Sequence, residues 1–230
     1  MARTAPPDRL EKLLAVAAAA FVRDGFRLTQ MDDIADTLGI SKGTVYRYVD
    51  SKETLLGAVL MYVDRPEALP VDLPLTSLSL TNIADDVAGV LAEALRGSLL
   101  ANTLADPVPV EVVGDEAEAL VLDLFEMMAR NRTSIMVLDR CAAELPQLAG
   151  EWFDGGRYTA VDMWCEYLWL RASALALPGE VDFLARTIVE TIALWAVKMP
   201  WDPAPRPYDR TTAGPACAAV VRAMLGGGQR

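Results

Sequence analysis

The feature that most constrains this chain is a pair of short helical patterns separated by one glycine, between residues 29 and 53. Gly39 interrupts the apolar spacing where the chain must change direction, and glycine tolerates the positive φ that ends a helix. Ala35 is small enough to let two helices cross closely. The apolar positions with helical spacing are Ile34, Ala35, Leu38, Ile40, Val45 and Val49. This stretch therefore predicts two short helices packed at an angle.

Side chains that can cap helices mark three helix starts in the same stretch. Thr29 is followed three residues later by Asp32, Ser41 precedes the second helix, and Ser51 precedes a third with Glu53 in its first turn. Each hydroxyl can accept a hydrogen bond from the free N–H groups of a first turn. We therefore expect helices to begin after Thr29, Ser41 and Ser51.

The second of these helices carries polar side chains suited to a DNA groove. They are Lys42, Thr44, Tyr46, Arg47 and Tyr48. A helix placed end-on presents its N-terminal residues to base edges, while flanking ammonium and hydroxyl groups bind phosphates. Lys52 lies in the first turn of the next helix, whose free N–H groups favour an anion. The pattern is typical of a DNA-reading helix-turn-helix.

This pattern resembles the TetR family of bacterial transcription regulators. The resemblance covers residues 8–56 and is carried by Met31, Ile34, Ala35, Gly39, the SKGTVYRY stretch and the SKE that follows. It implies base contacts from Lys42, Gly43 and Thr44, and phosphate contacts from Tyr46, Tyr48 and Lys52. Gln30 replaces a threonine that is frequent in the family, and Val49 replaces a phenylalanine. The predicted DNA-binding residues are Thr29, Gln30, Lys42, Gly43, Thr44, Tyr46, Arg47, Tyr48 and Lys52.

The rest of the chain shows helical patterns only, so we predict an all-α fold. The expected helices span residues 54–63, 81–102, 115–131, 132–144, 151–176 (or from 157, after two glycines), 180–199 and 208–225. Residues 1–53 are predicted to form the helix-turn-helix domain, with the motif at about 30–49. Residues 54–230 are predicted to form a larger helical domain for ligand sensing and dimerisation.

The net charge of −11 is unevenly distributed along the chain. Residues 1–53 hold eight basic and eight acidic residues, so the whole negative balance lies in the remainder. From 40 to 52 the balance is +2, with three basic residues and one acidic residue. A mildly basic DNA face on an acidic body predicts modest salt dependence and a need for dimerisation.

The absence of histidine excludes many catalytic sites. Ser-His and Cys-His pairs, imidazole bases and His-ligated metals are all ruled out. Cys141, Cys165 and Cys217 are too widely spaced for a zinc cluster or a disulfide framework, and they fit a reducing compartment. We expect no metal, no cofactor and no enzyme activity, although carboxylate or lysine chemistry stays open.

No segment is apolar for long enough to cross a bilayer. The longest apolar run, residues 13–22, is about half the roughly 20 residues that a spanning helix needs. A signal-peptide core is the alternative, but charged flanks and a single apolar face favour an amphipathic helix. That face consists of Leu10, Leu13, Leu14, Ala17, Ala18 and Phe21. We expect a bacterial cytoplasmic protein without a membrane partner.

Bulky, adaptable side chains gather in the second half of the chain, which holds all five tryptophans. They are either plain core or the lining of a pocket for a small apolar ligand. The pocket candidates are Phe125, Met128, Met136, Met163, Trp164, Tyr167 and Trp169.

The helix expected at 180–199 has a wide apolar face that another surface must cover. In the family resembled, helices at this position pair across a two-fold axis, which makes Ile188, Ile192 and Trp195 dimer candidates, with intrachain core as the alternative. The resemblance implies a homodimeric repressor that binds a near-palindromic operator in double-stranded DNA and is released by an unidentified small molecule. A helical enzyme and an interaction module without DNA function remain alternatives.

Overall fold

The computed structural model describes residues 7–70, 72–76, 78–109, 111–175, 179–203 and 209–226. These residues are mainly helical, with one isolated bridge between Val49 and Leu75, so the predicted all-α fold is confirmed. The chain forms two compact units. Unit 1 comprises Met1–Gly89 and Thr133–Phe153, and unit 2 comprises Val90–Arg132 and Asp154–Arg230.

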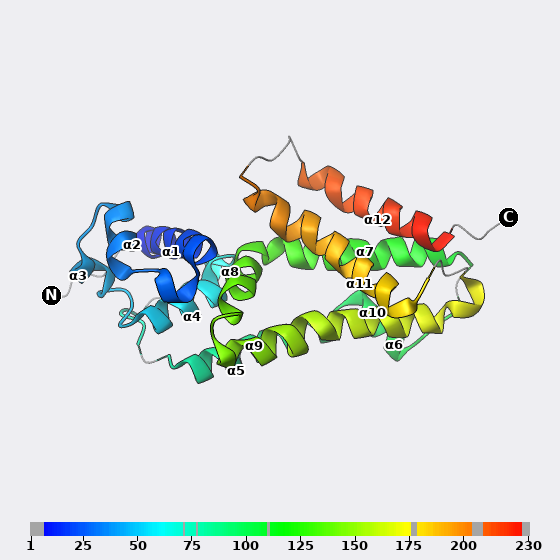
Figure 1. The fold of residues 1–230 in the computed structure, drawn as a ribbon, viewed down its shortest axis with the longest axis horizontal. Coiled ribbons are helices and arrows are strands. Elements are labelled where there is room, and N and C mark those ends of the chain that lie inside the picture. The colour runs from blue at the N-terminus through cyan, green and yellow to red at the C-terminus, as the bar shows by residue number, and fades with distance from the viewer. Residues whose placement is uncertain are drawn as a thin grey trace. The chain divides into compact units, whose positions relative to one another are not determined.

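Unit 1 contains the predicted helix-turn-helix and several elements from further along the chain (Figure 1). Its elements are α1 (Pro7–Leu28), α2 (Met31–Leu38), α3 (Lys42–Val45), α4 (Lys52–Tyr62), the short η1 (Pro66–Ala68), the first half of α5 (Leu80–Arg96), α8 (Arg132–Ala142) and α9 (Pro146–Trp152). Helix α1 packs on α4 and α2, and α2 packs on α3. The functional boundary predicted after Glu53 stays a prediction, while the compact unit extends well beyond it.

The core of unit 1 is built on the apolar face predicted for the first helix. All six of its residues are buried, and burial of each larger aliphatic side chain contributes about 1.5–3 kcal/mol. Helix α5 approaches α4 closely at Gly57, where an added Cβ would meet Leu78 and Ile83. These contacts fix α4 beneath the helix-turn-helix.

Unit 2 holds the longer helices of the second half. Its elements are the rest of α5, α6 (Leu99–Ala105), α7 (Val113–Arg130), α10 (Thr159–Leu170), η3 (Ala172–Ala174), α11 (Val181–Ala193), the π-helical η4 (Leu194–Lys198), η5 (Met199–Trp201) and α12 (Arg210–Gly226). Helices α7 and α12 run side by side, with Gly214 against the Phe125 ring, and α10 packs on α11 (Figure 1). Among the described residues, none of these helices is both long and apolar enough to span a membrane.

Several predicted helix boundaries were wrong. The helix expected at 81–102 is broken at Gly97, and Ser98 begins α6 by accepting from the N–H of Ala101. Helix α9 begins earlier than expected, with Pro146 in its first turn. It continues through a π-helical turn, η2 (Phe153–Tyr158), which contains the two glycines, into α10. The expected ends at 176 and 208 lie outside the described residues.

Candidate nucleic-acid interface

The turn between α2 and α3 has the geometry that the sequence predicts. Gly39 has φ 64°, in the left-handed region, and ends α2. Its N–H donates to the carbonyl of Asp36, and the N–H of Ile40 donates to the carbonyl of Ala35, both at 3.0 Å. Ala35 is buried at the crossing. The glycine turn and the small crossing residue are therefore confirmed.

Two of the three predicted caps are confirmed. The Ser41 hydroxyl accepts from the N–H of Thr44 at 3.2 Å, and the Ser51 hydroxyl accepts from the N–H of Thr54 at 3.0 Å. The cap assigned to Thr29 was wrong. Gln30 occupies the capping position of α2 without a side-chain cap, and Thr29 is buried.

Thr29 is turned inward because its hydroxyl donates to the carbonyl of Gly25 at 2.6 Å. With 1% of its surface exposed, it cannot reach DNA in this conformation, which corrects the prediction that it contacts DNA. Gln30, the next residue, is exposed at the start of α2.

The start of α3 presents the predicted base-reading residues to solvent. Lys42 and Gly43 are exposed and Thr44 is half-buried. The Lys42 ammonium pairs with Asp32 at 2.9 Å, and this hydrogen bond raises the pKa of the lysine. Both side chains of the pair are more than half exposed, 51% and 60%, so a phosphate or base edge can replace the carboxylate.

Helix α3 is shorter than the sequence suggests, because it ends at Val45. Tyr46 and Arg47 lie at or just past its end and are exposed, so both remain available to DNA. Tyr48 differs, since only 3% of its surface is exposed and its ring belongs to the core. Of the two tyrosines predicted to contact phosphates, only Tyr46 is exposed, so the prediction is kept for Tyr46 and dropped for Tyr48.

Lys52 also faces inward rather than toward a bound anion. Its ammonium donates to the carbonyls of Phe26 at 2.8 Å and Thr29 at 3.0 Å. It also lies 4.5 Å from the centroid of the Phe26 ring. The predicted phosphate contact is replaced here by bonds within the chain.

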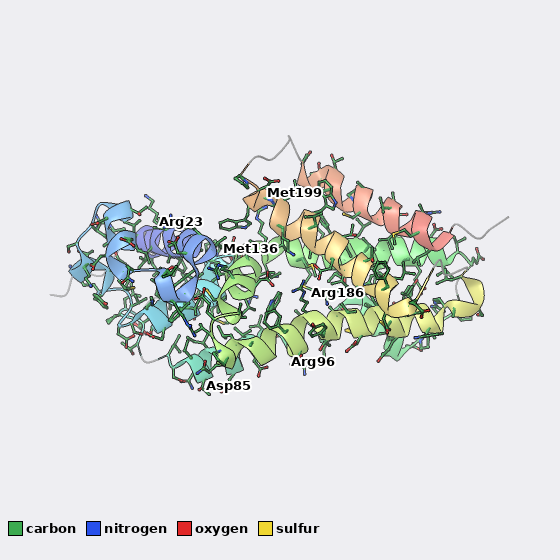
Figure 2. The ribbon with its side chains drawn as sticks, in the orientation of Figure 1. Arg23, Asp85, Arg96, Met136, Arg186 and Met199 are labelled. Atoms are coloured by element: carbon green, nitrogen blue, oxygen red, sulfur yellow. The ribbon has the colours of Figure 1, made fainter. Side chains whose placement is uncertain are left out.

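The ligand candidates do not come together in one place. Phe125 and Tyr167 are buried but do not line the pocket described below, although the Tyr167 ring packs on Trp164 at 5.5 Å between centroids. Met128 is half-buried, and Trp169 is 65% exposed. Met136 lies on α8 and belongs to unit 1, as its label in Figure 2 shows. Adaptable side chains alone did not distinguish a pocket from ordinary core.

A small pocket in unit 2 includes two of those candidates, Met163 and Trp164. The other lining residues are Leu95, Ser98, Leu100, Leu120, Asp123, Leu124 and Ala160. Trp164 is fully buried, and in the described part of the chain its indole N–H has no hydrogen-bond partner. The remaining lining residues carry no signal in the sequence beyond helical periodicity. The pocket thus combines apolar walls with one unused donor.

The predicted dimer residues lie mostly inside unit 2. Ile188 and Ile192 are fully buried within the single chain, which corrects their assignment to a subunit contact. Trp195 is half-buried. The large apolar side chains that stay exposed on this part of the unit are Phe183 of α11, Leu194 of η4 and Val220 of α12.

Glu190 of α11 is surrounded by cations. Arg157 lies at 2.6 Å, Arg186 at 2.9 Å and Lys198 at 3.7 Å from its carboxylate oxygens. Figure 2 labels Arg186, whose guanidinium also lies 5.5 Å from the Tyr158 ring. Burial raises the pKa of Glu190, but the hydrogen bond from Arg157 and the three positive charges outweigh it and lower the pKa. Glu190 is therefore ionised and links both π-helical turns to α11.

The family model of bacterial regulatory proteins, tetR family, matches residues 13–59. The HTH-type transcriptional repressor KstR2 of Rhodococcus jostii is 42% identical over 52 residues, which cover 23% of this chain and 26% of that protein. KstR2 of Mycolicibacterium smegmatis is 40% identical over 55 residues, which cover 24% of this chain and 27% of that protein. The matched stretch therefore spans about a quarter of the length of these relatives.

Solved structures resemble the fold over nearly the whole chain. The ketosteroid transcriptional regulator KstR2 of Mycobacterium tuberculosis has a TM-score of 0.57 at 18% identity, covering 98% of each chain. A TetR-family regulator from Bordetella parapertussis has a TM-score of 0.54 at 20% identity, covering 95% of this chain and 94% of that one. The proteins named here are regulators rather than enzymes. The amino-terminal domain of the chain therefore matches the tetR family of bacterial regulatory proteins, and its fold is similar to that of solved regulators of that family.

Proposed function

We propose that this protein is a repressor that binds a specific DNA sequence through α2 and α3. The observation that carries the proposal is the capped α3, whose first residues Lys42 and Gly43 are exposed together with Tyr46 and Arg47. Base edges are read by residues at the start of such a helix, while the flanking side chains bind phosphates. The match to the family model of bacterial regulatory proteins, tetR family, lies in this same domain, at residues 13–59.

We infer that the repressor acts as a homodimer. A single copy of unit 1 presents few cations to DNA, because the Lys52 ammonium is hydrogen-bonded to backbone carbonyls of its own chain. Two copies would double the contacts and place their reading helices about 34–36 Å apart, on a near-palindromic site. Phe183, Leu194 and Val220 supply exposed apolar surface for such a contact, which makes a second copy of unit 2 the proposed occupant of that face.

A small apolar molecule is the proposed effector, and the pocket beside Trp164 is its proposed site. In this structure the pocket has space for only about one water molecule, so its walls must move apart to admit the ligand. Leucine side chains dominate the walls, and the unpaired indole N–H would favour a ligand with one hydrogen-bond acceptor. Release from DNA requires that the ligand bind more tightly to a conformation in which the two helix-turn-helix motifs of the dimer are spaced wrongly for the operator. We call the helix-turn-helix, α2 and α3, the reading head.

Selection of duplexes from a random pool tests the DNA-binding proposal. The wild-type chain is expected to enrich a near-palindromic sequence, and Lys42→Ala and Tyr46→Phe are expected to weaken binding to it. Arg96→Ala is the matched control, because it removes one exposed positive charge from unit 2. Enrichment of no sequence by the folded wild type would overturn the proposal, as would equal losses in Lys42→Ala and Arg96→Ala.

A further inference from the structure

The segment that joins α1 to α2, residues 25–29, is held from two sides by charged side chains. We call it the α1–α2 junction. Gly25 has φ 79° and ψ 177°, so the helical backbone of α1 is interrupted there. Such an interruption leaves neighbouring backbone groups without helical partners, and buried groups of this kind need others. The partners come from α4 and from the end of α8.

Arg140 of α8 and Glu144, which lies two residues after the end of α8, supply the first set of partners. The Glu144 carboxylate accepts from the backbone N–H of Arg27 at 2.8 Å, across 117 residues of sequence. The Arg140 guanidinium donates to the other oxygen of Glu144 at 2.7 Å and to the carbonyl of Asp24 at 3.2 Å. The guanidinium of Arg27 donates in turn to the carbonyl of Glu144 at 3.2 Å. A backbone N–H and a backbone carbonyl of the interrupted stretch therefore both find partners, in Glu144 and Arg140.

Lys52 of α4 supplies the second set. Its ammonium donates to the carbonyls of Phe26, Arg27 and Thr29 at 2.8, 3.4 and 3.0 Å. A carboxylate therefore lies at the start of this short helical turn and an ammonium at its end, which complements the dipole of the turn. The three donors of Lys52 are all engaged with backbone carbonyls.

The position of the junction determines where α2 begins. Thr29 is buried in the junction, and Gln30 and α2 follow directly. Helix α3 is in turn fixed to α2 through the hydrogen-bonded turn at Gly39. A shift of the junction would therefore move both DNA-reading helices, even though Glu144 and Arg140 lie far outside residues 1–53 in sequence.

We propose that Glu144 and Arg140 are positioning residues for DNA reading, which act by fixing the α1–α2 junction from α8. The inference rests on the proposed DNA-binding function and extends it to a helix outside the helix-turn-helix. The two side chains make no phosphate contact in this role. Their loss should weaken specific binding without changing the number of counterions that binding releases.

The test compares Glu144→Ala and Glu144→Gln with Glu118→Ala on the selected operator. Glu118 is the matched control, because it pairs with Arg222 at 2.9 Å in unit 2. Glu144→Ala should weaken operator binding roughly 10- to 100-fold, as expected for the loss of hydrogen bonds to a charged group. Glu144→Gln keeps an acceptor for the Arg27 N–H and should recover part of that loss. Glu118→Ala should bind like the wild type.

Two readouts separate positioning from contact and from unfolding. The salt slope of operator binding should not change in Glu144→Ala, whereas Lys42→Ala should reduce it by about one. Amide exchange should accelerate at Arg27 and its neighbours in Glu144→Ala and remain slow in α7 and α12. Exchange needs no DNA, so it reports on the junction independently.

Three outcomes would overturn the proposal. Wild-type operator affinity in Glu144→Ala would refute the positioning role directly. Accelerated exchange throughout the chain would show that Glu144 supports general stability instead. A reduced salt slope in Glu144→Ala would indicate an electrostatic effect on phosphate binding. If the wild-type chain selects no sequence from the random pool, the proposed DNA-binding function is itself refuted, and this result is distinct from the three above.

Discussion

Glu116 in unit 2 and Glu144 in unit 1 are buried to a similar degree but have different partners. Their side chains are 14% and 17% exposed. The arginine paired with Glu116, Arg171, is only 10% exposed, whereas Arg140 beside Glu144 is 40% exposed. The two glutamates are therefore buried alike, but the Arg171–Glu116 pair in unit 2 is largely shielded from water, and we call it the dry pair. The Arg140–Glu144 pair in unit 1 is partly solvated.

The Glu116 pair joins side chains within the body of unit 2. Arg171 donates twice to its carboxylate, at 2.8 and 2.7 Å, and the Tyr167 hydroxyl donates at 3.0 Å. Burial, together with the charge of Glu116, raises the pKa of Tyr167 well above its usual value, so the phenol stays protonated and donates. Glu144 instead accepts from a backbone N–H at the α1–α2 junction. The comparison suggests that one glutamate stabilises the body and the other positions the reading head.

The largest expected effect comes from breaking the dry pair. Arg171→Ala leaves the largely buried Glu116 carboxylate without its cation, with the Tyr167 hydroxyl as its remaining donor, which should lower the free energy of unfolding by about 3–5 kcal/mol. Arg140→Ala should cost less, roughly 1 kcal/mol, because Arg140 is 40% exposed and water already solvates its side of the pair. Urea denaturation of both variants measures the difference. Equal losses would remove the distinction between the two glutamates.

Two glycines with positive φ allow the junction to be tested by sterics. Gly25→Ala must accept φ 79° and an added Cβ that overlaps the Glu144 carboxylate. We expect a loss of about 2–3 kcal/mol in the free energy of unfolding. Gly39→Ala is a comparison variant, because its φ of 64° is also positive, its ψ of 33° lies in the ordinary left-handed region, and nothing lies within 4 Å of the added Cβ.

Gly39→Ala should therefore cost only about 1–2 kcal/mol, the penalty for a left-handed alanine. Thermal or urea denaturation of the two variants measures the combined effect of the clash with Glu144 and of the ψ of 177° at Gly25, which alanine adopts less readily than the backbone of Gly39. Should both variants lose the same stability, the close approach of Glu144 to Gly25 would carry no energetic weight.

A smaller effect is expected at the caps of the reading helices. Ser41→Ala removes the acceptor for the Thr44 N–H and should cost about 1 kcal/mol, within the range for exchanging a capping serine. Thr29→Val tests the residue that does not cap α2. It removes a hydroxyl bonded to Gly25, so it should affect the junction rather than the start of α2. Amide exchange measures both effects. Ser41→Ala should accelerate exchange in the first turn of α3, whereas Thr29→Val should accelerate it in the α1–α2 junction and not in the first turn of α2.

Local chemistry explains why much of the reading head could be predicted. The turn at Gly39 and the caps at Ser41 and Ser51 depend on residues a few positions apart, and all three were confirmed. Thr29 failed for a local reason as well. The backbone break at Gly25 gives its hydroxyl a carbonyl partner four residues back, which competes with capping.

The contacts of Glu144 could not be predicted, because sequence patterns carry no information about a partner 117 residues away. Ile188 and Ile192 illustrate a second difficulty. An apolar helical face looks the same whether its own chain or a second copy covers it, and here unit 2 covers both residues. Of the residues that line the pocket beside Trp164, only Met163 and Trp164 were predicted. The others were missed for the same reason, since they share the periodicity of ordinary core.

The smallest expected effect concerns the pH dependence of unit 2. Glu190 has a lowered pKa, because Arg157, Arg186 and Lys198 together outweigh the effect of burial. A group with a lowered pKa in the folded state binds its proton more weakly there than in the unfolded chain. Its stabilisation is therefore fully present above the usual value of 4.5 and is lost as the pH falls through the lower folded-state value.

Glu190→Gln should reduce stability at neutral pH and have progressively less effect as the acid range is entered. Urea denaturation of the wild type and of Glu190→Gln from pH 7 downward measures this convergence. The Glu118→Gln variant controls for the loss of an exposed carboxylate, because Glu118 has one arginine partner where Glu190 has three cations. A constant difference between wild type and Glu190→Gln across this range would show that the three cations stabilise the fold by packing rather than by charge.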